Sequence, residues 1–181
     1  MLVDSHCHLD MIADHQDLDE VIGRARRAGV QTMVTISTTL SGWDRVKEIA
    51  ETYDNVWCSV GVHPHEAGPE GQSAPDKLIE LAQHPRVVGI GESGLDYHYD
   101  NSSRQAQAES FRTHIVAARE TGLPLIVHAR EADEDTARIL REGYEQGPFP
   151  CVMHCFSSGI GLAEAALDLG FYISMSGIAT F

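Results

Sequence analysis

The sequence predicts a single α/β domain built as a (β/α)8 TIM barrel that lacks its last strand and C-terminal helices. The first observation is that seven apolar, strand-like segments alternate with six amphipathic helical segments over the 181 residues. This alternation favours a parallel sheet whose strands are joined by crossover helices. The second observation is that histidines and a glutamate follow the carboxyl ends of five of these strands.

Each expected element follows from a local pattern. Val21, Ile22 and Ala25 repeat at helical spacing, and Gly29 is placed to end that helix. The Gly- and Pro-rich residues 66–74 are expected to form a surface loop, not a domain boundary. The expected strands cover residues 2–8, 32–37, 56–62, 87–92, 125–128, 151–155 and 172–176, and the helices cover 17–28, 43–50, 75–83, 104–120, 133–142 and 161–169.

Composition limits the partners of the chain. Thirteen Lys plus Arg residues against 27 Asp plus Glu give a formal net charge of −14, which repels a phosphate backbone. Broad coating of a duplex is therefore not expected, although bound divalent cations make one pocket positive enough for a nucleic acid end or a phosphate ester. Without a membrane-spanning run, a signal peptide or a framework of cysteines, we expect no membrane partner, reduced thiols and a cytoplasmic location.

The first candidate site is the segment Asp4-Ser5-His6-Cys7-His8. Side chains of a strand alternate between its faces, so Asp4, His6 and His8 share one face. Two imidazoles two residues apart at a strand end can bind one metal ion, and neutral imidazole suits zinc and its neighbours. Such pairs also occur by chance, so the meaning of this one depends on the rest of the chain.

Polar residues end four further apolar strands: His63, Glu92, His128 and His154. One such histidine is more often a core residue bonded to a carbonyl, but several at matching strand ends favour a shared site. In a barrel these ends converge on one mouth, whereas an open doubly wound sheet scatters them beyond the roughly 2.0–2.2 Å reach of metal ligands. Glu92 is expected to point into the barrel and bridge two cations, because a buried carboxylate requires a partner or a metal.

Other polar residues at the same mouth are candidates for substrate contacts. His63, His65 and Arg130 are suited to holding phosphate oxygens, although each also fits a solvated loop. Three further residues are expected to line the substrate cleft: Tyr97, His98 and Ser157.

Two motifs are assigned no catalytic role. Residues 89–94 match the G-x-G-x-x-G pattern of dinucleotide sites, but an acidic residue stands where pyrophosphate would approach and no apolar helix follows. Cys151 and Cys155 flank His154 on the opposite strand face and, like Cys7, are expected to pack and not to act as nucleophiles.

Five motifs, at residues 4–10 (DSHCHLD), 61–65 (GVHPH), 91–98 (GESGLDYH), 128–130 (HAR) and 154–157 (HCFS), resemble in order and spacing those of the TatD-like metal-dependent hydrolases. The resemblance covers the whole chain. It implies a (β/α)8 barrel of the amidohydrolase superfamily, in which studied members include metal-dependent deoxyribonucleases. It also implies a ligand set, with one metal on His6 and His8, a second on His128 and His154, and Glu92 between them.

The chain departs from this family at its C-terminal end. The family uses an aspartate after the last barrel strand as a metal ligand and proton acceptor, and the sequence ends at Phe181, before such a residue. Seven strands cannot close an eight-stranded barrel, so the first and last strands would have unpaired edges. We therefore expect residues 1–181 to be one C-terminally incomplete domain. A shortened gene, a truncated polypeptide and a partner that supplies the missing strand all fit this expectation.

The resulting hypothesis is a TatD-type deoxyribonuclease that hydrolyses DNA ends in the 3′–5′ direction with two divalent ions, Mg²⁺, Mn²⁺ or Zn²⁺. Glu92, His63 and Arg130 are the expected catalytic residues, and the full-length protein is expected to be a monomer. Two alternatives stay open. One is an amide or ester hydrolase, such as an aminoacyl-ester deacylase, and the other is an inactive, truncated metal-binding fragment.

Overall fold

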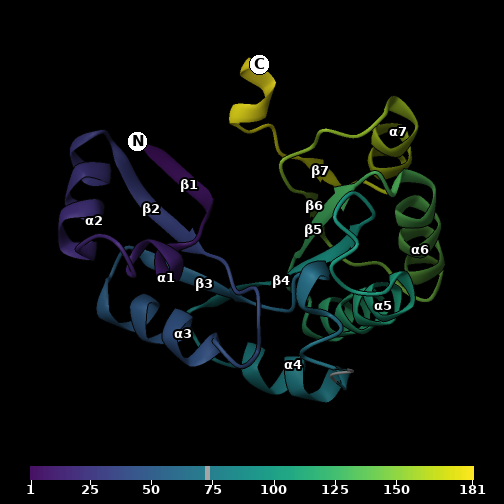
Figure 1. The fold of residues 1–181 in the computed structure, drawn as a ribbon, viewed down its shortest axis with the longest axis horizontal. Helices are drawn as coiled ribbons and strands as arrows, with labels where there is room; N and C mark the ends of the chain where they lie inside the picture. The colour runs from purple at the N-terminus through teal and green to yellow at the C-terminus, as the bar shows by residue number, and fades with distance from the viewer. Residues whose placement is uncertain (72–73) are drawn as a thin grey trace.

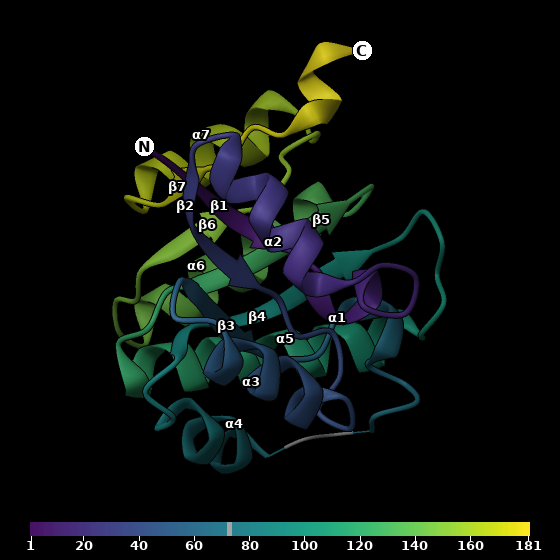
Figure 2. The same ribbon diagram turned by 90° about the vertical axis from the view of Figure 1, so that its left-hand side faces the viewer.

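The computed structural model describes residues 1–71 and 74–181, so two residues of the expected loop 66–74 lie outside it. Seven parallel strands form one sheet in which the spatial order, β1 to β7, equals the chain order. The sheet curls, with its helices on the outer side, and β1 and β7 lie at its two edges (Figure 1). The turned view shows α2 and α3 on the outer side of β2 and β3 (Figure 2). This arrangement confirms the predicted α/β barrel architecture.

Every expected strand and helix is present, and most of their ends lie within three residues of the expected ones. A short helix directly after the first strand was not predicted, the fourth strand runs on past Glu92 to Asp96, and the last strand has only two residues. The strands are β1 (Leu2–Cys7), β2 (Val30–Thr35), β3 (Val56–Val60), β4 (Val87–Asp96), β5 (Leu125–Arg130), β6 (Cys151–Met153) and β7 (Tyr172–Ile173). The helices are α1 (Leu9–Ile12), α2 (Leu18–Arg27), α3 (Trp43–Thr52), α4 (Pro75–Ala82), α5 (Arg104–Thr121), α6 (Asp133–Glu145) and α7 (Ile160–Asp168), with 3₁₀ turns η1 (Pro64–Glu66) and η2 (Gly177–Thr180).

Capping residues explain where α2 and α5 begin and where α5 ends. The Asp17 carboxylate accepts a hydrogen bond from the backbone N–H of Asp19, and the Ser103 hydroxyl accepts one from Ala106, so each satisfies a free amide of the first turn. Gly122 ends α5 with a φ of 70°, a conformation that favours glycine. The local sequence therefore fixes the ends of the long helix that covers β4.

Strand β4 approaches its neighbours so closely that only glycine fits at two positions. A Cβ on Gly61 of the β3 end would lie 2.5 Å from the backbone of Gly91, and a Cβ on Gly94 would overlap the carbonyl oxygen of His128. Gly94 also has a φ of 140°. These contacts set the distances between the strand ends that carry Glu92 and His128.

The core fills the space between the sheet and its outer helices. Phe111 and Ile115 of α5 pack there with Leu95 and Val127, each no more than 2% exposed. The two edge strands are less buried than this core, because Leu2 of β1 is 59% exposed and Tyr172 of β7 is 75% exposed. Among the described helices, none has the length and apolar character needed to cross a membrane.

Candidate metal centre

The carboxyl ends of the strands form a polar cavity at one mouth of the curled sheet. Its volume is about 290 Å³. The walls come from β1, β3, β4 and the segment after β6, which is the convergence expected of a barrel. The residues around it are His6, His8, Met11, Thr38, His63, His65, Glu66, Glu92 and His154.

Glu92 lies at the centre of this site and is only 3% exposed. Its Oε2 is 3.1 Å from Nε2 of His6 and 4.0 Å from Nε2 of His8. Its Oε1 is 3.3 Å from Nδ1 of His128 and 4.0 Å from Nε2 of His63. The two carboxylate oxygens therefore face two different sets of imidazoles.

Two groups of described residues bring ligand atoms within 4.8 Å of one another, His6–His8–Glu92 and His63–Glu92–His128. Glu92 belongs to both. A carboxylate shared between two imidazole groups is a donor set that suits two divalent ions of the zinc or manganese type. The first group matches the expected ligands, whereas the second contains His63 where His154 was expected.

The protonation pattern of the first group leaves its metal-facing nitrogens free. Nδ1 of His8 lies 3.3 Å from the carbonyl of Ile36 and donates to it, so Nε2 keeps its lone pair toward Glu92. Nε2 of His6 is buried and makes no hydrogen bond to any described residue. A buried nitrogen without a hydrogen-bond partner next to a carboxylate is what a metal ligand requires, so these residues fit the ion.

Burial and neighbouring charges act on Glu92 and His128 in opposite directions. Burial opposes ionisation of Glu92, but the close rings of His128 and His6 outweigh it and hold the pKa of this carboxyl well below its usual value. Burial likewise opposes protonation of His128, but Glu92 and Asp96 on its two sides raise its pKa. Without metal, these carboxylates therefore favour the protonated form of His128.

His63 carries its proton on the nitrogen that faces Glu92. Its Nδ1 accepts a hydrogen bond of 3.2 Å from the backbone N–H of His65, so a neutral ring has its hydrogen on Nε2. Burial lowers the pKa of His63 to about 4, which keeps the ring neutral at pH 7. In this state His63 is a hydrogen-bond donor into the cavity.

His154 lines the cavity, but its ring forms no close contact with the Glu92 carboxylate of the kind that His128 forms at 3.3 Å. Its ring stacks on His6 with a centroid distance of 3.3 Å and an interplanar angle of 8°. Burial, together with the proximity of His6, lowers the pKa of His154 to about 4. The ring is therefore neutral at pH 7, the state in which an imidazole can bind a metal.

Comparison with known families is consistent with this geometry. The family model described as TatD related DNase matches residues 3–181. The chain belongs to the TatD-related DNase family. As a member of it, the chain is a metal-dependent hydrolase.

Individual relatives agree with this membership. The TatD-family chain is 43% identical to the uncharacterized metal-dependent hydrolase YcfH of Escherichia coli K12, over 99% of its own length and 68% of the relative. It is 34% identical to the 3′-5′ ssDNA/RNA exonuclease TatD of Klebsiella pneumoniae, over 90% of its own length and 61% of that protein. The crystal structure of YJJV, a TatD homologue of E. coli K12, superposes with a TM-score of 0.86 at 27% identity, covering 99% of this chain and 70% of that one.

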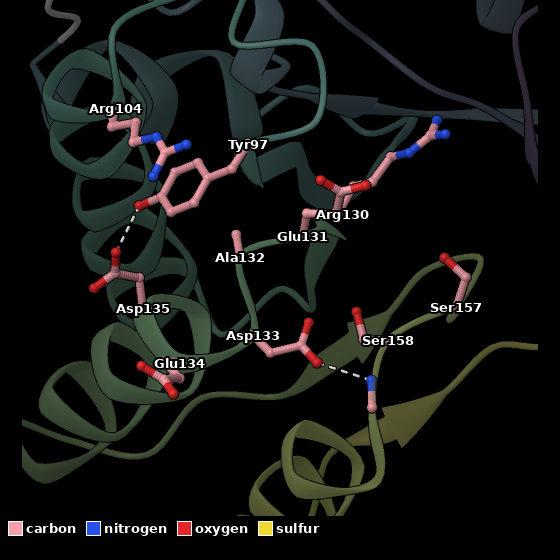
Figure 3. Close-up of a pocket in the computed structure, with 11 residues that line it drawn as sticks. Tyr97, Arg104, Arg130, Glu131, Ala132, Asp133, Glu134, Asp135, Ser157 and Ser158 are labelled. Carbon is pink, nitrogen blue, oxygen red and sulfur yellow. Dashed lines mark hydrogen bonds between the residues drawn. The ribbon is translucent and has the colours of Figure 1, made fainter.

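Arg130 of this TatD-family chain faces a second cavity beside the metal centre. The cavity has a volume of about 620 Å³, with Tyr97 and Arg104 on one side and Arg130 and Ser157 on the other (Figure 3). The Arg130 guanidinium stacks on Tyr99 at 4.9 Å and pairs with no carboxylate of the described residues. Tyr97 and Ser157 thus line a cleft at the same mouth.

Sequence reasoning gave Asp96 no role, although it ends β4 with no exposed surface. Its Oδ2 lies 2.9 Å from Nε2 of His65 and 3.0 Å from Nε2 of His128. The signal for Asp96 was available, because an aspartate four residues after Glu92 lies on the same strand face if β4 continues. The expected strand ended at Glu92, so this pairing was missed.

Cys7 and Cys151 pack as expected, whereas Cys155 lies beyond the end of β6 and its Sγ is 2.7 Å from the Ser176 hydroxyl oxygen. All four cysteines are free. Burial raises the pKa of Cys7 and of Cys58 to about 12, and burial also raises that of Cys151. None of these three is a thiolate near neutral pH, so none is poised as a nucleophile.

Proposed function

We propose that this TatD-family chain carries the metal centre of a 3′–5′ exonuclease that removes nucleotides from the ends of single-stranded DNA. The observation that carries the proposal is the placement of Glu92, with one oxygen toward His6 and His8 and the other toward His128. His6 and His8 would hold one divalent ion and His128 and His154 a second, with the Glu92 carboxylate available to both. Mg²⁺, Mn²⁺ and Zn²⁺ are the candidate ions.

Divalent ions in this position lower the pKa of a bound water and stabilise charge that develops on a phosphoryl group. The side chains supply the remaining steps. Nε2–H of His63 points into the cavity and donates a hydrogen bond to a non-bridging phosphate oxygen. Arg130 has a guanidinium that pairs with no described carboxylate, so its donors are available to a neighbouring phosphate.

The charge of the chain favours action at an end of the nucleic acid. A net charge of −14 opposes contact along a strand, whereas a terminal nucleotide needs only the few contacts around the metal centre. The adjacent 620 Å³ cavity is large enough for one nucleoside. The printed name of the Klebsiella relative, a 3′-5′ ssDNA/RNA exonuclease, supports this substrate class.

The test is digestion of a 5′-labelled single-stranded oligonucleotide after chelation and re-addition of Mg²⁺, Mn²⁺ or Zn²⁺. We expect a metal-dependent ladder of products shortened from the 3′ end. His63→Asn should lower the rate about 100-fold, as expected for loss of one donor to a developing charge. The matched control is His84→Asn, since His84 lies on the surface beside Glu51 and should leave the rate unchanged.

Other outcomes separate the alternatives. Hydrolysis of an aminoacyl ester without DNA cleavage would replace the exonuclease with a deacylase of the same centre. Bound metal without hydrolysis of either substrate, in a sample that lacks a cooperative thermal transition, would identify an inactive fragment. Absence of bound metal at equilibrium with excess ion would refute the centre itself.

A further inference from the structure

Asp96 is connected to the metal centre through two histidines and to the backbone through two amides. Oδ2 lies 2.9 Å from Nε2 of His65 and 3.0 Å from Nε2 of His128. Oδ1 accepts hydrogen bonds from the backbone N–H groups of His98 and Tyr99, at 3.0 and 2.9 Å. The two oxygens of this buried side chain therefore have different partners.

The carboxylate determines which nitrogen of each ring carries hydrogen. Oδ1 of Asp96 accepts from two backbone amides while its Oδ2 faces two imidazole nitrogens, an arrangement that suits the ionised carboxylate. An ionised carboxylate only accepts hydrogen bonds, so Nε2 of His65 and of His128 must both be the donors. A neutral His128 then has an unprotonated Nδ1, which is the nitrogen 3.3 Å from Oε1 of Glu92.

A second set of buried hydrogen bonds holds Asp96 itself. Its N–H donates to Oε1 of Gln107 at 2.8 Å, and Nε2 of Gln107 donates to the carbonyls of Asp96 and Ser102 at 3.1 and 2.9 Å. The Ser102 hydroxyl donates to the carbonyl of His65 at 2.7 Å. Gln107 is fully buried and Ser102 nearly so, so β4, α5 and the segment of His65 form one rigid frame.

We propose that Asp96 is a positioning residue that keeps His128 in the Nε2–H tautomer, so that Nδ1 of His128 faces the metal beside Glu92. The inference rests on the metal centre of the proposed function but not on its substrate. A carboxylate that accepts from the outer nitrogen of a ligand histidine fixes the ring orientation and strengthens the ligand. His65, which shares the same oxygen, is held in the same tautomer and extends the frame to the cavity wall.

The variant Asp96→Asn tests this assignment with a specific geometry. The asparagine oxygen can replace Oδ1 and keep the two backbone amides, which turns the NH₂ group toward the imidazoles. A donor in that place forces Nε2 of His128 to accept, so the hydrogen moves to Nδ1 and blocks the metal-facing nitrogen. We expect metal affinity, measured by competition with a chromophoric chelator, to fall about 10- to 100-fold.

The matched control is Asp19→Asn. The Asp19 carboxylate also accepts a side-chain hydrogen bond, from the Tyr53 hydroxyl at 2.8 Å, but lies on α2 at the surface. This variant should keep wild-type metal affinity. Equal affinity losses in the two variants, or none in Asp96→Asn, would overturn the proposal.

A second measurement needs no variant. Long-range ¹H–¹⁵N correlation spectra of the metal-free wild-type protein, above the pKa of His128, report which imidazole nitrogen carries hydrogen. We expect Nε2–H for His128, and Nδ1–H would overturn the proposal even if Asp96→Asn does not fold. Both readouts are independent of nuclease activity, so an inactive chain with the expected tautomer and affinity change would refute only the exonuclease.

Discussion

The middle strand of the sheet, β4, buries polar side chains, whereas the edge strands β1 and β7 expose apolar ones. Glu92 is 3% and Asp96 is 0% exposed, while Leu2 is 59% and Tyr172 is 75% exposed. Buried carboxylates are tolerated in the middle because histidines and amides surround them. The exposed apolar residues lie on the first and last strands of the sheet, each of which pairs with a single neighbouring strand.

The contrast shows where the structure tolerates change. In the middle of the sheet, strand spacing, burial and hydrogen bonds depend on one another, so a small change affects the fold and the candidate metal centre together. At the edges each strand has a single neighbour, and a side chain contributes little to packing. Three substitutions test this difference.

The largest effect is expected for Gly94→Ala in β4. A Cβ would overlap the carbonyl oxygen of His128, and the φ of 140° disfavours an L side chain, so we expect a loss of about 4 kcal/mol or more in the free energy of unfolding. Urea denaturation measures it. Gly161→Ala is the control, because open space surrounds Gly161 in α7 and alanine there should stabilise the helix by about 0.5–1 kcal/mol. Similar values for the two variants would contradict the close approach of β4 to β5.

An intermediate effect is expected from pH at His114, a fully buried ring of α5 that accepts from the Val62 amide and donates to the Ser110 carbonyl. Burial lowers its pKa from 6.5 to about 4. Between these values the unfolded state binds the additional proton, so stability falls as pH decreases through this window. A shift of this size corresponds to about 3 kcal/mol.

The measurement is the free energy of unfolding of wild-type protein and His114→Gln across that pH range. At pH values above the window both side chains are neutral, so the difference there reports the two hydrogen bonds alone. Below it the variant should have lost about 3 kcal/mol less than the wild type. Parallel pH curves would show that the pKa of His114 is the same in the folded and unfolded states, which would contradict the lowered pKa.

The smallest effect is expected for Tyr172→Ser in β7. The side chain is 75% exposed and the strand has two residues, so the free energy of unfolding should change by less than about 0.5 kcal/mol. Light scattering should show weaker self-association, because an apolar group is removed from a sheet edge. A loss above about 1 kcal/mol would mean that the edge is packed as firmly as the middle.

The sequence alone was sufficient to predict the architecture and the convergence of the candidate site residues on one mouth of the sheet. Strand and helix periods of two and 3.6 residues are local properties, so alternation of the two patterns was readable without the fold. The carboxyl ends of parallel strands meet at one mouth, which placed His6, His8 and Glu92 together in advance. The helix α1 was missed because four residues are too few to show a period.

Tertiary structure alone decided how the side chains of the site are arranged. The stacking of His154 on His6, the approach of His63 to Glu92 and the pairing of Asp96 with His65 and His128 all join residues from different strands. Such pairings depend on inter-strand distance, which the close contact of Gly94 with His128 sets, and on hydrogen bonds between residues about 30 positions apart. Local periodicity contains no information about either. The sequence therefore predicted that the candidate ligands lie at one mouth, but it did not predict their tautomers or side-chain orientations.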